Sequence, residues 1–458
     1  MSDLPYLSLI ASSRNDDHGG NTLYRTQIFI DSFLQQCEQH QLRAELILVE
    51  WNPPQDRSPL AEVIDWRHQN PWVDCRIITV PFERHILLRF ARTLPLFQMI
   101  AKNVGIRRAR GEFILATNID ILFSDELMAL LAKKALRADR HYRCDRFDVD
   151  SQIPIDISLG EKLQYAKENL VRRNHRMHPP EIAALQARGA PLEDLIRAAL
   201  NTSQFAVETE TGVPTLTINS NAPALWLHTN GCGDFTLLHR DAWKKIRGYA
   251  EFEMFSLHLD SLGIATAHHA GIRETWFPPP AVCYHIEHAL GSGLTQENQT
   301  PLFERIEQQG ISWFDYDVIK PLLNEKQPFQ FNTEKWGLRD IPLDETVCTC
   351  QGFRIQNVPS ALQAAPYAAV TALHPELNTD RYFRNTLRHL SEHLQIQLRS
   401  RMQSKAAKIQ MIRQILENIN KEWGFKLQQF SQRILGRLGK VVRRLSSIRK
   451  VFQDRIAL

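Results

Sequence analysis

The sequence predicts an α/β fold in which a mixed, mostly parallel sheet is flanked by helices, with a helical insertion and a C-terminal α-helical extension. Within the first 120 residues, short β-rich apolar runs alternate with segments of helical periodicity. Polar helical patterns interrupted by prolines then occupy residues 151–224, and the pattern becomes helical again after residue 359. The composition, with 43% hydrophobic and 23% charged residues, is that of an ordinary globular protein.

Four strands and two helices are expected in the N-terminal region. The strands are predicted at residues 6–11, 45–50, 76–80 and 113–116, and the helices at residues 26–40 and 97–110. Ligands of open α/β sheets bind at the carboxyl ends of the strands. Polar or charged residues follow three of these four strands, so a ligand site is expected at that edge of the sheet.

A catalytic domain is predicted over residues 1–345, with residues 151–224 as its helical insertion. Late in this domain, a helix over residues 240–247 ends at Gly248, a common helix stop. The remaining residues, 346–458, are predicted to form a C-terminal helical region.

Charge is distributed unevenly along the chain. The 55 Lys and Arg against 51 Asp and Glu give a net charge of +4, but residues 399–458 hold 15 basic and 3 acidic residues. This tail therefore carries +12 and residues 1–398 carry −8, which argues against general nucleic-acid binding by the body. Apolar residues recur every three or four positions in the tail, which predicts an amphipathic helical segment. Its basic face suits an anionic membrane surface, and packing against the body or in a homo-oligomer is the alternative.

The cysteine usage and the termini indicate the compartment. The seven cysteines are scattered and odd in number, which favours a reducing environment over a disulfide framework. The N-terminus lacks the basic region of a secretory signal, and no apolar run reaches the ~18 residues that a membrane-spanning helix needs. A cytoplasmic protein is expected, and membrane binding by the tail would place it peripherally on the inner face.

The strongest local motif runs from residue 102 to residue 120, as KNVG followed by ARGEFILATNID. A helix leads through Gly111 into a buried strand, and the strand delivers Asp120 to its carboxyl end. Mg²⁺ and Mn²⁺ prefer oxygen ligands and bind through one or two carboxylates together with substrate phosphates. A strand followed by an ordinary acidic turn would produce the same pattern.

This run resembles the motif of GT-A glycosyltransferases, especially inverting family 2 enzymes and the related galactosyltransferases, in which a helix and a strand lead to two aspartates. The resemblance implies a Rossmann-like domain that moves a sugar from a nucleotide-diphosphate sugar to a hydroxyl acceptor such as a glycan, polysaccharide or glycolipid. It also implies that Asp120 binds Mn²⁺ or Mg²⁺. Asn118 stands where the family has its first aspartate, which weakens the expectation of metal dependence.

The same resemblance suggests contacts with the donor nucleotide. The polar loop after the first strand corresponds to the family's nucleotide-contacting loop, and the end of the second strand is where an acidic residue commonly meets the base or ribose. The candidates are Arg14, Asn15, Asp16, Glu50, Asn103, Asn118 and Arg143. An arginine can stabilise a leaving diphosphate through paired N–H donors, although residues 143–148 could also form a surface ladder of charges.

Inverting transfer needs a base that takes the proton of the acceptor hydroxyl. Asp260 is the candidate, because the family has an acidic pair whose second member lies eleven residues before a glycine, here Gly271. Asp234, in a glycine-containing segment, is the alternative base, or else a residue that holds the acceptor or the donor sugar. A helix N-cap would be the structural explanation for Asp260.

Two histidines near the end of the predicted catalytic domain complete the candidate site. In GT-A enzymes a histidine in this region often binds the metal or touches the diphosphate, and neutral imidazole is a competent ligand. His285 and His288 are the candidates here, with a structural role as the alternative for either one.

Two other functions remain open at this point. A nucleotidyltransferase could use a similar sheet, although the loop over residues 12–21 has only one arginine to bind a triphosphate. A catalytically inactive, glycosyltransferase-like binding or scaffold protein would explain why Asn118 and Leu259 replace acidic residues of the family.

Overall fold

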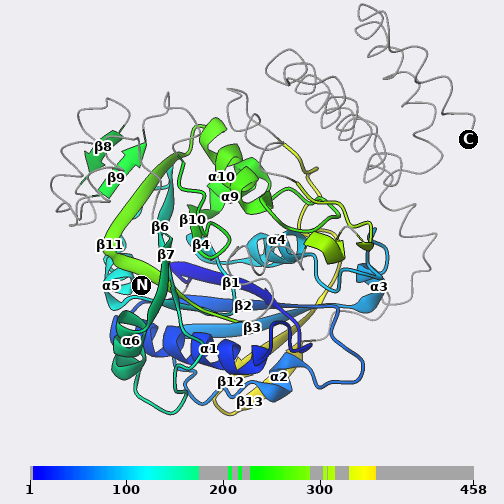
Figure 1. Cartoon of the computed structure of the whole chain (residues 1–458), viewed down its shortest axis with the longest axis horizontal. Helices are drawn as coiled ribbons and strands as arrows, with labels where there is room; N and C mark the ends of the chain where they lie inside the picture. Colours follow the sequence, from blue (N-terminus) through cyan, green and yellow to red (C-terminus); the bar gives the residue numbers. More distant parts are fainter. Residues whose placement is uncertain are drawn as a thin grey trace, which may run out of the picture. The chain divides into compact units, whose positions relative to one another are not determined.

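The structure is a computed structural model and describes residues 4–174, 205–208, 215–218, 227–288, 303–306, 308–314 and 330–356 (Figure 1). The chain divides into two units, Met1–Thr386 and Leu387–Leu458, and all described residues belong to the first. The predicted basic tail, residues 399–458, lies outside the described residues.

The described elements follow the βα alternation that the sequence predicts. In chain order the strands are β1 (Leu7–Ser13), β2 (Ala44–Trp51), β3 (Val73–Val80), β4 (Phe113–Ala116), β5 (Ile121–Phe123), β6 (Arg140–Val149), β7 (Leu170–Asn174), β8 (Phe205–Glu208), β9 (Thr215–Ile218), β10 (Thr236–His239), β11 (Arg273–Ile286), β12 (Asp344–Thr349) and β13 (Gly352–Gln356). The helices are α1 (Thr22–Gln39), α2 (Leu60–Val63), α3 (Phe82–His85), α4 (Gln98–Arg108), α5 (Asp125–Ala132), α6 (Leu159–Glu168), α9 (Arg240–Ile246) and α10 (Leu259–His269).

One sheet of 13 strands organises the described part of the chain. Its order is β13-β12-β3-β2-β1-β4-β10-β6-β11-β9-β8, with β5 beside β11 and β7 beside β6. Strands β3, β2, β1 and β4 are parallel neighbours, in the order of one half of a doubly wound nucleotide-binding sheet. Strand β10 then runs antiparallel between β4 and β6. The predicted mixed sheet with a mostly parallel core is confirmed.

Helices cover both faces of the central strands. Figure 1 shows α1 and α6 on one side of β1, and α4, α9 and α10 on the other. Leu9 and Ala11 of β1 pack in the same core as Phe33 of α1, whereas Ile10 packs in the core that contains Val104 of α4. Successive strand side chains point to opposite faces, so a strand buried on both faces appears in the sequence as an uninterrupted apolar run.

Glycine in the KNVG motif sets how closely α4 approaches the sheet. A Cβ added at Gly105 would lie 2.4 Å from Cγ2 of Ile10 and 3.1 Å from Cγ2 of Val49. Any larger residue would therefore push α4 away from β1 and β2. This close approach places the residues at the start of α4 beside the carboxyl ends of the strands.

The structure corrects two parts of the predicted domain plan. The segment predicted as a helical insertion, residues 151–224, contains α6 but also the strands β7, β8 and β9, which extend the sheet. The predicted domain boundary after residue 345 falls inside β12. Strand β12 pairs antiparallel with β3, and β13 pairs with β12 at the edge of the sheet, so residues 346–356 are strand and turn rather than helix.

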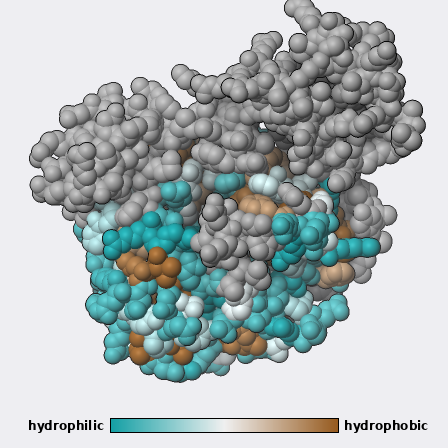
Figure 2. All heavy atoms as spheres, in the orientation of Figure 1, coloured by the Kyte–Doolittle hydropathy of each residue, from teal (hydrophilic) through white to brown (hydrophobic). Residues whose placement is uncertain are grey.

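The surface and the cysteines agree with the sequence. Among the residues coloured in Figure 2, most are hydrophilic and the apolar patches are small and separated. All seven cysteines are free thiols, and only Cys350 is exposed. None of the helices in the described ranges combines the length and the apolar character needed to cross a bilayer.

Candidate active site

The predicted site residues gather where the direction of the sheet changes. Strand β1 lies between β2 and β4. The strands that follow β1 in the chain, β2 and β3, lie on one side of it, and β4 lies on the other, so the strand order reverses beside β1. In such sheets the crevice outside the carboxyl ends of the strands at this position binds ligands. After β4 the chain is tied down by Thr117, whose Oγ1 donates to the carbonyl of Asp234, 2.7 Å away.

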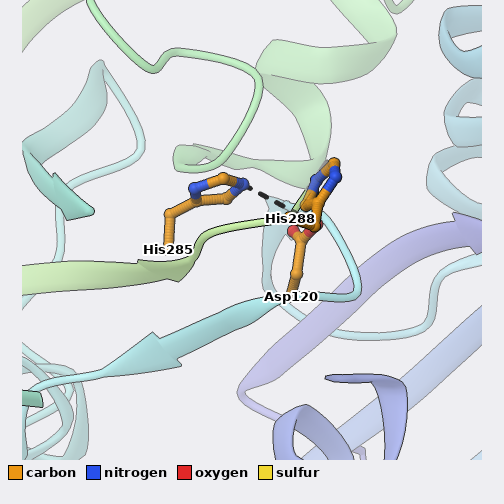
Figure 3. Close-up of side chains that lie close together, drawn as sticks. All are labelled: Asp120, His285 and His288. Carbon is orange, nitrogen blue, oxygen red and sulfur yellow. Dashed lines mark ion pairs between the residues drawn. The ribbon is translucent and has the colours of Figure 1, made fainter. Parts of the chain in front are cut away.

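Asp120, His285 and His288 form one cluster at this edge. Both imidazoles lie close to the Asp120 carboxylate in Figure 3. Nε2 of His288 lies 3.2 Å from Oδ2 of Asp120, and Nε2 of His285 lies 3.7 Å from it. The register of β11 explains this meeting, because His285 pairs with Ile121 and the amide of Ile286 donates to the carbonyl of Asp120. The structure thus brings together the three residues predicted as metal ligands.

The cluster fits a divalent cation. The potential ligand atoms of the three residues all lie within 4.8 Å of one another. Asp120 is only 6% exposed, and its Oδ1 is buried without a hydrogen-bond partner. A buried, unsatisfied carboxylate oxygen is costly unless something binds it. Two imidazoles and one carboxylate that bind one face of a metal ion are a common ligand set for divalent transition metals.

A second carboxylate orients His285. Nδ1 of His285 lies 3.2 Å from Oδ1 of Asp148, on the side of the ring away from Asp120. A carboxylate behind a histidine holds the proton on that nitrogen and leaves the other nitrogen for a metal. Burial opposes the charged imidazole, but Asp120 and Asp148 outweigh it and raise the pKa of His285 above its usual value. For Asp120 burial is likewise outweighed, and the two histidines and Arg25 hold the pKa of its carboxyl well below its usual range.

Two residues of the site, His18 and Arg25, are absent from the sequence prediction. Arg25 is buried, and its Nε lies 4.0 Å from Oδ2 of Asp120 while its guanidinium donates to the carbonyls of His18 and Gly20. The His18 ring lies 6.3 Å from the His288 ring, centroid to centroid. The sequence predicts this helix only from residue 26, whereas α1 begins at Thr22 and includes Arg25.

Asn118, the departure from the family motif, lies beside Asp234 and bridges two side chains. Its Nδ2 donates to Oδ1 of Asp234 at 2.5 Å, and its Oδ1 accepts from Nε2 of Gln98 at 2.8 Å. The other oxygen of Asp234 accepts from Nη1 of Arg146 at 2.7 Å. Asp234 and Asp148 outweigh the effect of burial and raise the pKa of Arg146. An amide suits this position because it can donate to one neighbour and accept from the other, whereas an aspartate would repel Asp234.

Asp260 occupies the first turn of α10. Its Oδ1 accepts from the amide of Ser261 at 2.8 Å, and a Cβ added at Gly233 would lie 3.0 Å from its Oδ2. The N-cap of this helix is His258, so Asp260 is not the capping residue. The carboxylate therefore lies against the turn that carries Asp234, which brings the two candidate bases to the same place.

Two of the predicted donor contacts, Asn103 and Arg143, bind other parts of the protein. The amide of Asn103 binds the carbonyl and the N–H of Tyr249 and also donates to Glu251, which ties α4 to the segment after α9. Arg143 is fully buried and donates to the carbonyls of His228 and Asn230, both at 2.9 Å. Their contacts give these two residues a packing role.

The remaining predicted donor contacts lie in the loop after β1 and at the carboxyl end of β2. Arg14 forms an ion pair with Asp16 at 3.1 Å, and Nδ2 of Asn15 donates to the carbonyl of Ser58 at 2.9 Å. Glu50 accepts from the amide of Leu60 at 2.8 Å, and burial raises the pKa of its carboxyl. The two loops are thus held against each other at the carboxyl ends of adjacent strands.

Comparisons with known proteins add little to this geometry. No protein-family model matches the sequence, and no curated protein matches it. Among solved structures, the chain is similar to the crystal structure of S. aureus TarS 1–349 in complex with UDP, with 10% sequence identity and a TM-score of 0.34. The similarity covers 66% of this chain and 65% of that chain, slightly less than two thirds of its length.

Proposed function

We propose that this chain is a nucleotide-sugar-dependent glycosyltransferase of the GT-A type. The observation that carries the proposal is the Asp120–His285–His288 cluster at the carboxyl end of β4, with Asp234 and Asp260 on the neighbouring turn and helix. One group of side chains suits a cation that holds a diphosphate, and the other supplies a carboxylate to accept a proton. Both are needed for the transfer of a sugar from a nucleotide diphosphate to a hydroxyl group.

Asp120, His285 and His288 would hold the divalent ion. When bound there, Mn²⁺ or Mg²⁺ would neutralise negative charge on the diphosphate of the donor. Imidazole ligands suit transition metals better than Mg²⁺, so Mn²⁺ is the expected ion. Asp148 would keep His285 oriented, and Arg25 would contribute positive charge beside Oδ2 of Asp120.

The donor nucleotide would lie across the loops that follow β1 and β2. The residues proposed to line it are Arg14, Asn15, Asp16 and Glu50. Asn118 would act indirectly, because its amide fixes Asp234 and Gln98 in place.

Asp260 would act as the base, with inversion at the sugar. Its carboxylate accepts the proton of the acceptor hydroxyl while the acceptor oxygen bonds to the anomeric carbon. The bond between that carbon and the diphosphate oxygen breaks at the same time, and its electron pair leaves on the nucleoside diphosphate. Both oxygens of Asp234 are already engaged by Asn118 and Arg146, so Asp234 suits a holding role better than proton transfer.

Thermal melts with a panel of nucleoside diphosphates, with and without Mn²⁺, test the proposal. One nucleoside diphosphate is expected to raise the melting temperature only when Mn²⁺ is present, because the cation joins the diphosphate to Asp120. The effect should vanish in Asp120→Asn and persist in Asp241→Asn, an exposed aspartate on α9. No stabilisation by any nucleotide would contradict the proposal. Nucleotide binding without release of nucleoside diphosphate from any nucleotide sugar would favour the inactive binding protein instead.

A further inference from the structure

Lys102 is a buried charged residue beneath the candidate site. It lies in α4 within the KNVG motif and has an exposed fraction of 0%. Lysine is almost never fully buried unless it is paired, because its ammonium loses its hydration. Burial accordingly lowers the pKa of Lys102 to about 8. Methionine or leucine would fill this helix position without that penalty, so the charge itself calls for an explanation.

The ammonium holds a specific turn. Nζ of Lys102 donates to the carbonyl of Gly233 at 2.8 Å. An ammonium has three N–H donors, and this is the one hydrogen bond that Nζ makes within the described part of the chain. The turn over residues 231–234 carries Asp234, which contacts Asn118 after β4, and Gly233, which lies against Asp260 of α10.

This turn has little freedom to shift. A Cβ added at Gly233 would lie 3.0 Å from Oδ2 of Asp260, and one added at Gly231 would lie 3.0 Å from Cβ of Arg146. The turn is thus enclosed between α10 and β6, and Lys102 fixes it from the side of α4. A small movement of the Gly233 carbonyl would change the spacing between Asp234 and Asp260.

Charges from three segments face Lys102. Asp234 on the turn, Asp260 on α10 and Asp120 after β4 all favour the charged ammonium, and the Cys232 thiol adds to this effect. The other cation nearby, Arg146 on β6, is paired with Asp234 and Asp148. These three carboxylates partly offset the cost of burying the Lys102 ammonium.

We propose that Lys102 is a positioning residue for the transfer reaction, which holds the 231–234 turn, and with it the spacing between Asp234 and Asp260, through the Gly233 carbonyl. This inference rests on the proposed function. Lys102 does not touch the substrate in this account. It sets the position of the turn against which the Asp260 carboxylate lies.

Lys102→Gln separates the charge from the hydrogen bond, because the amide can still donate to Gly233. The measurement is the pH profile of nucleoside diphosphate release from the nucleotide sugar that the protein uses. Nucleoside diphosphate binding should be unchanged and kcat should fall about 10-fold. A basic limb near pH 8, due to Lys102 itself, should disappear.

Lys162 provides a matched control. It is a second buried lysine, 3% exposed, and lies on α6, where its Nζ donates to the carbonyl of Ile157 just before the helix. Lys162→Gln should leave the pH profile unchanged. Lys102→Met removes both the charge and the hydrogen bond, and should lower kcat further than Lys102→Gln while nucleotide still stabilises the protein in thermal melts.

The outcomes distinguish this inference from the proposed function. If the wild-type protein binds no nucleotide, both are overturned. If it binds a nucleotide and Lys102→Gln has the wild-type pH profile, only the positioning role is overturned. Nucleotide binding without any release of nucleoside diphosphate by the wild type also overturns that role, because the role requires a working base at Asp260.

Discussion

The two buried carboxylates Asp120 and Asp234 lie close together in the fold but have different partners. Asp120 faces two imidazoles, and its Oδ1 has no hydrogen bond. Asp234 has one oxygen bound by Arg146 and the other by Asn118. A carboxylate that is already saturated by a guanidinium and an amide has a positioning role, whereas one with imidazole neighbours and an unsatisfied oxygen can take a cation. The partners of an acidic residue, rather than its burial, separate the two roles.

Of the substitutions considered, removing the charge of Asp120 should change Mn²⁺ affinity the most. Asp120→Asn should weaken Mn²⁺ binding by more than about 100-fold, because it replaces a charged metal ligand. Mutating a residue that only hydrogen-bonds to a metal ligand already lowers metal affinity by about 10- to 100-fold. Isothermal titration with Mn²⁺ measures the affinity. Asp234→Asn, the matched change at the neighbouring carboxylate, should alter the Mn²⁺ affinity by less than about 3-fold. Equal losses in both variants would erase the distinction between the two carboxylates.

Asn118→Asp tests whether the amide is required as a bridge. It restores the acidic pair of the family motif, but it places a carboxylate 2.5 Å from Asp234. Like charges at this distance cannot both ionise, so the variant should be destabilised by about 2 to 3 kcal/mol in urea unfolding at pH 7. Its affinity for Mg²⁺ should not rise. A stable variant with tighter Mg²⁺ binding would show that this position can supply a metal ligand and that the amide bridge is not required.

Glu251 extends the comparison to a carboxylate with only neutral donors. It accepts from the amide of Asn103 and the N–H of Gly337, and burial raises its pKa to about 7. The unfolded chain ionises near pH 4.3, so the folded state binds the extra proton between about pH 4.3 and 7. The stability that Glu251 contributes is therefore present at low pH and is lost as the pH rises through 7. Relative to wild type, Glu251→Gln should gain about 2 kcal/mol between pH 5 and pH 8, measured by denaturant unfolding.

The carboxylate behind His285 should give the smallest effect. Asp148→Asn keeps the size of the side chain but weakens its hold on the imidazole, so Mn²⁺ affinity should fall about 10-fold. Glu126→Gln, at a surface ion pair with Lys167, is the control for loss of one acidic charge. An unchanged Mn²⁺ affinity in Asp148→Asn would mean that His285 does not depend on this contact.

The parts of the fold that depend on local pattern were predictable. Strand β4 is found at residues 113–116, as predicted, because FILA is a buried apolar run that follows a glycine turn. The cluster of Asp120, His285 and His288 could also be predicted, because each residue follows or ends a strand of the same sheet edge. Their common role as metal ligands is what the resemblance to GT-A enzymes implies, and it stays a prediction.

Other features depended on contacts that the sequence does not reveal. Asn103 sits in a motif that is compatible with nucleotide contact or with packing, and only the position of Tyr249 shows that it packs. The bridge through Asn118 joins residues more than 100 positions apart, so no local pattern indicates it. The β12 and β13 hairpin was missed because its pairing partner, β3, lies far away in the sequence.

The central claim is that two imidazoles and the Asp120 carboxylate bind a divalent cation in this protein. Electron paramagnetic resonance of bound Mn²⁺, in protein labelled with ¹⁵N-histidine, tests this most directly. The account predicts nitrogen couplings from two histidines, of which one is lost in His285→Ala and one in His288→Ala. Bound Mn²⁺ without histidine coupling, or an unchanged spectrum in both variants, would contradict it.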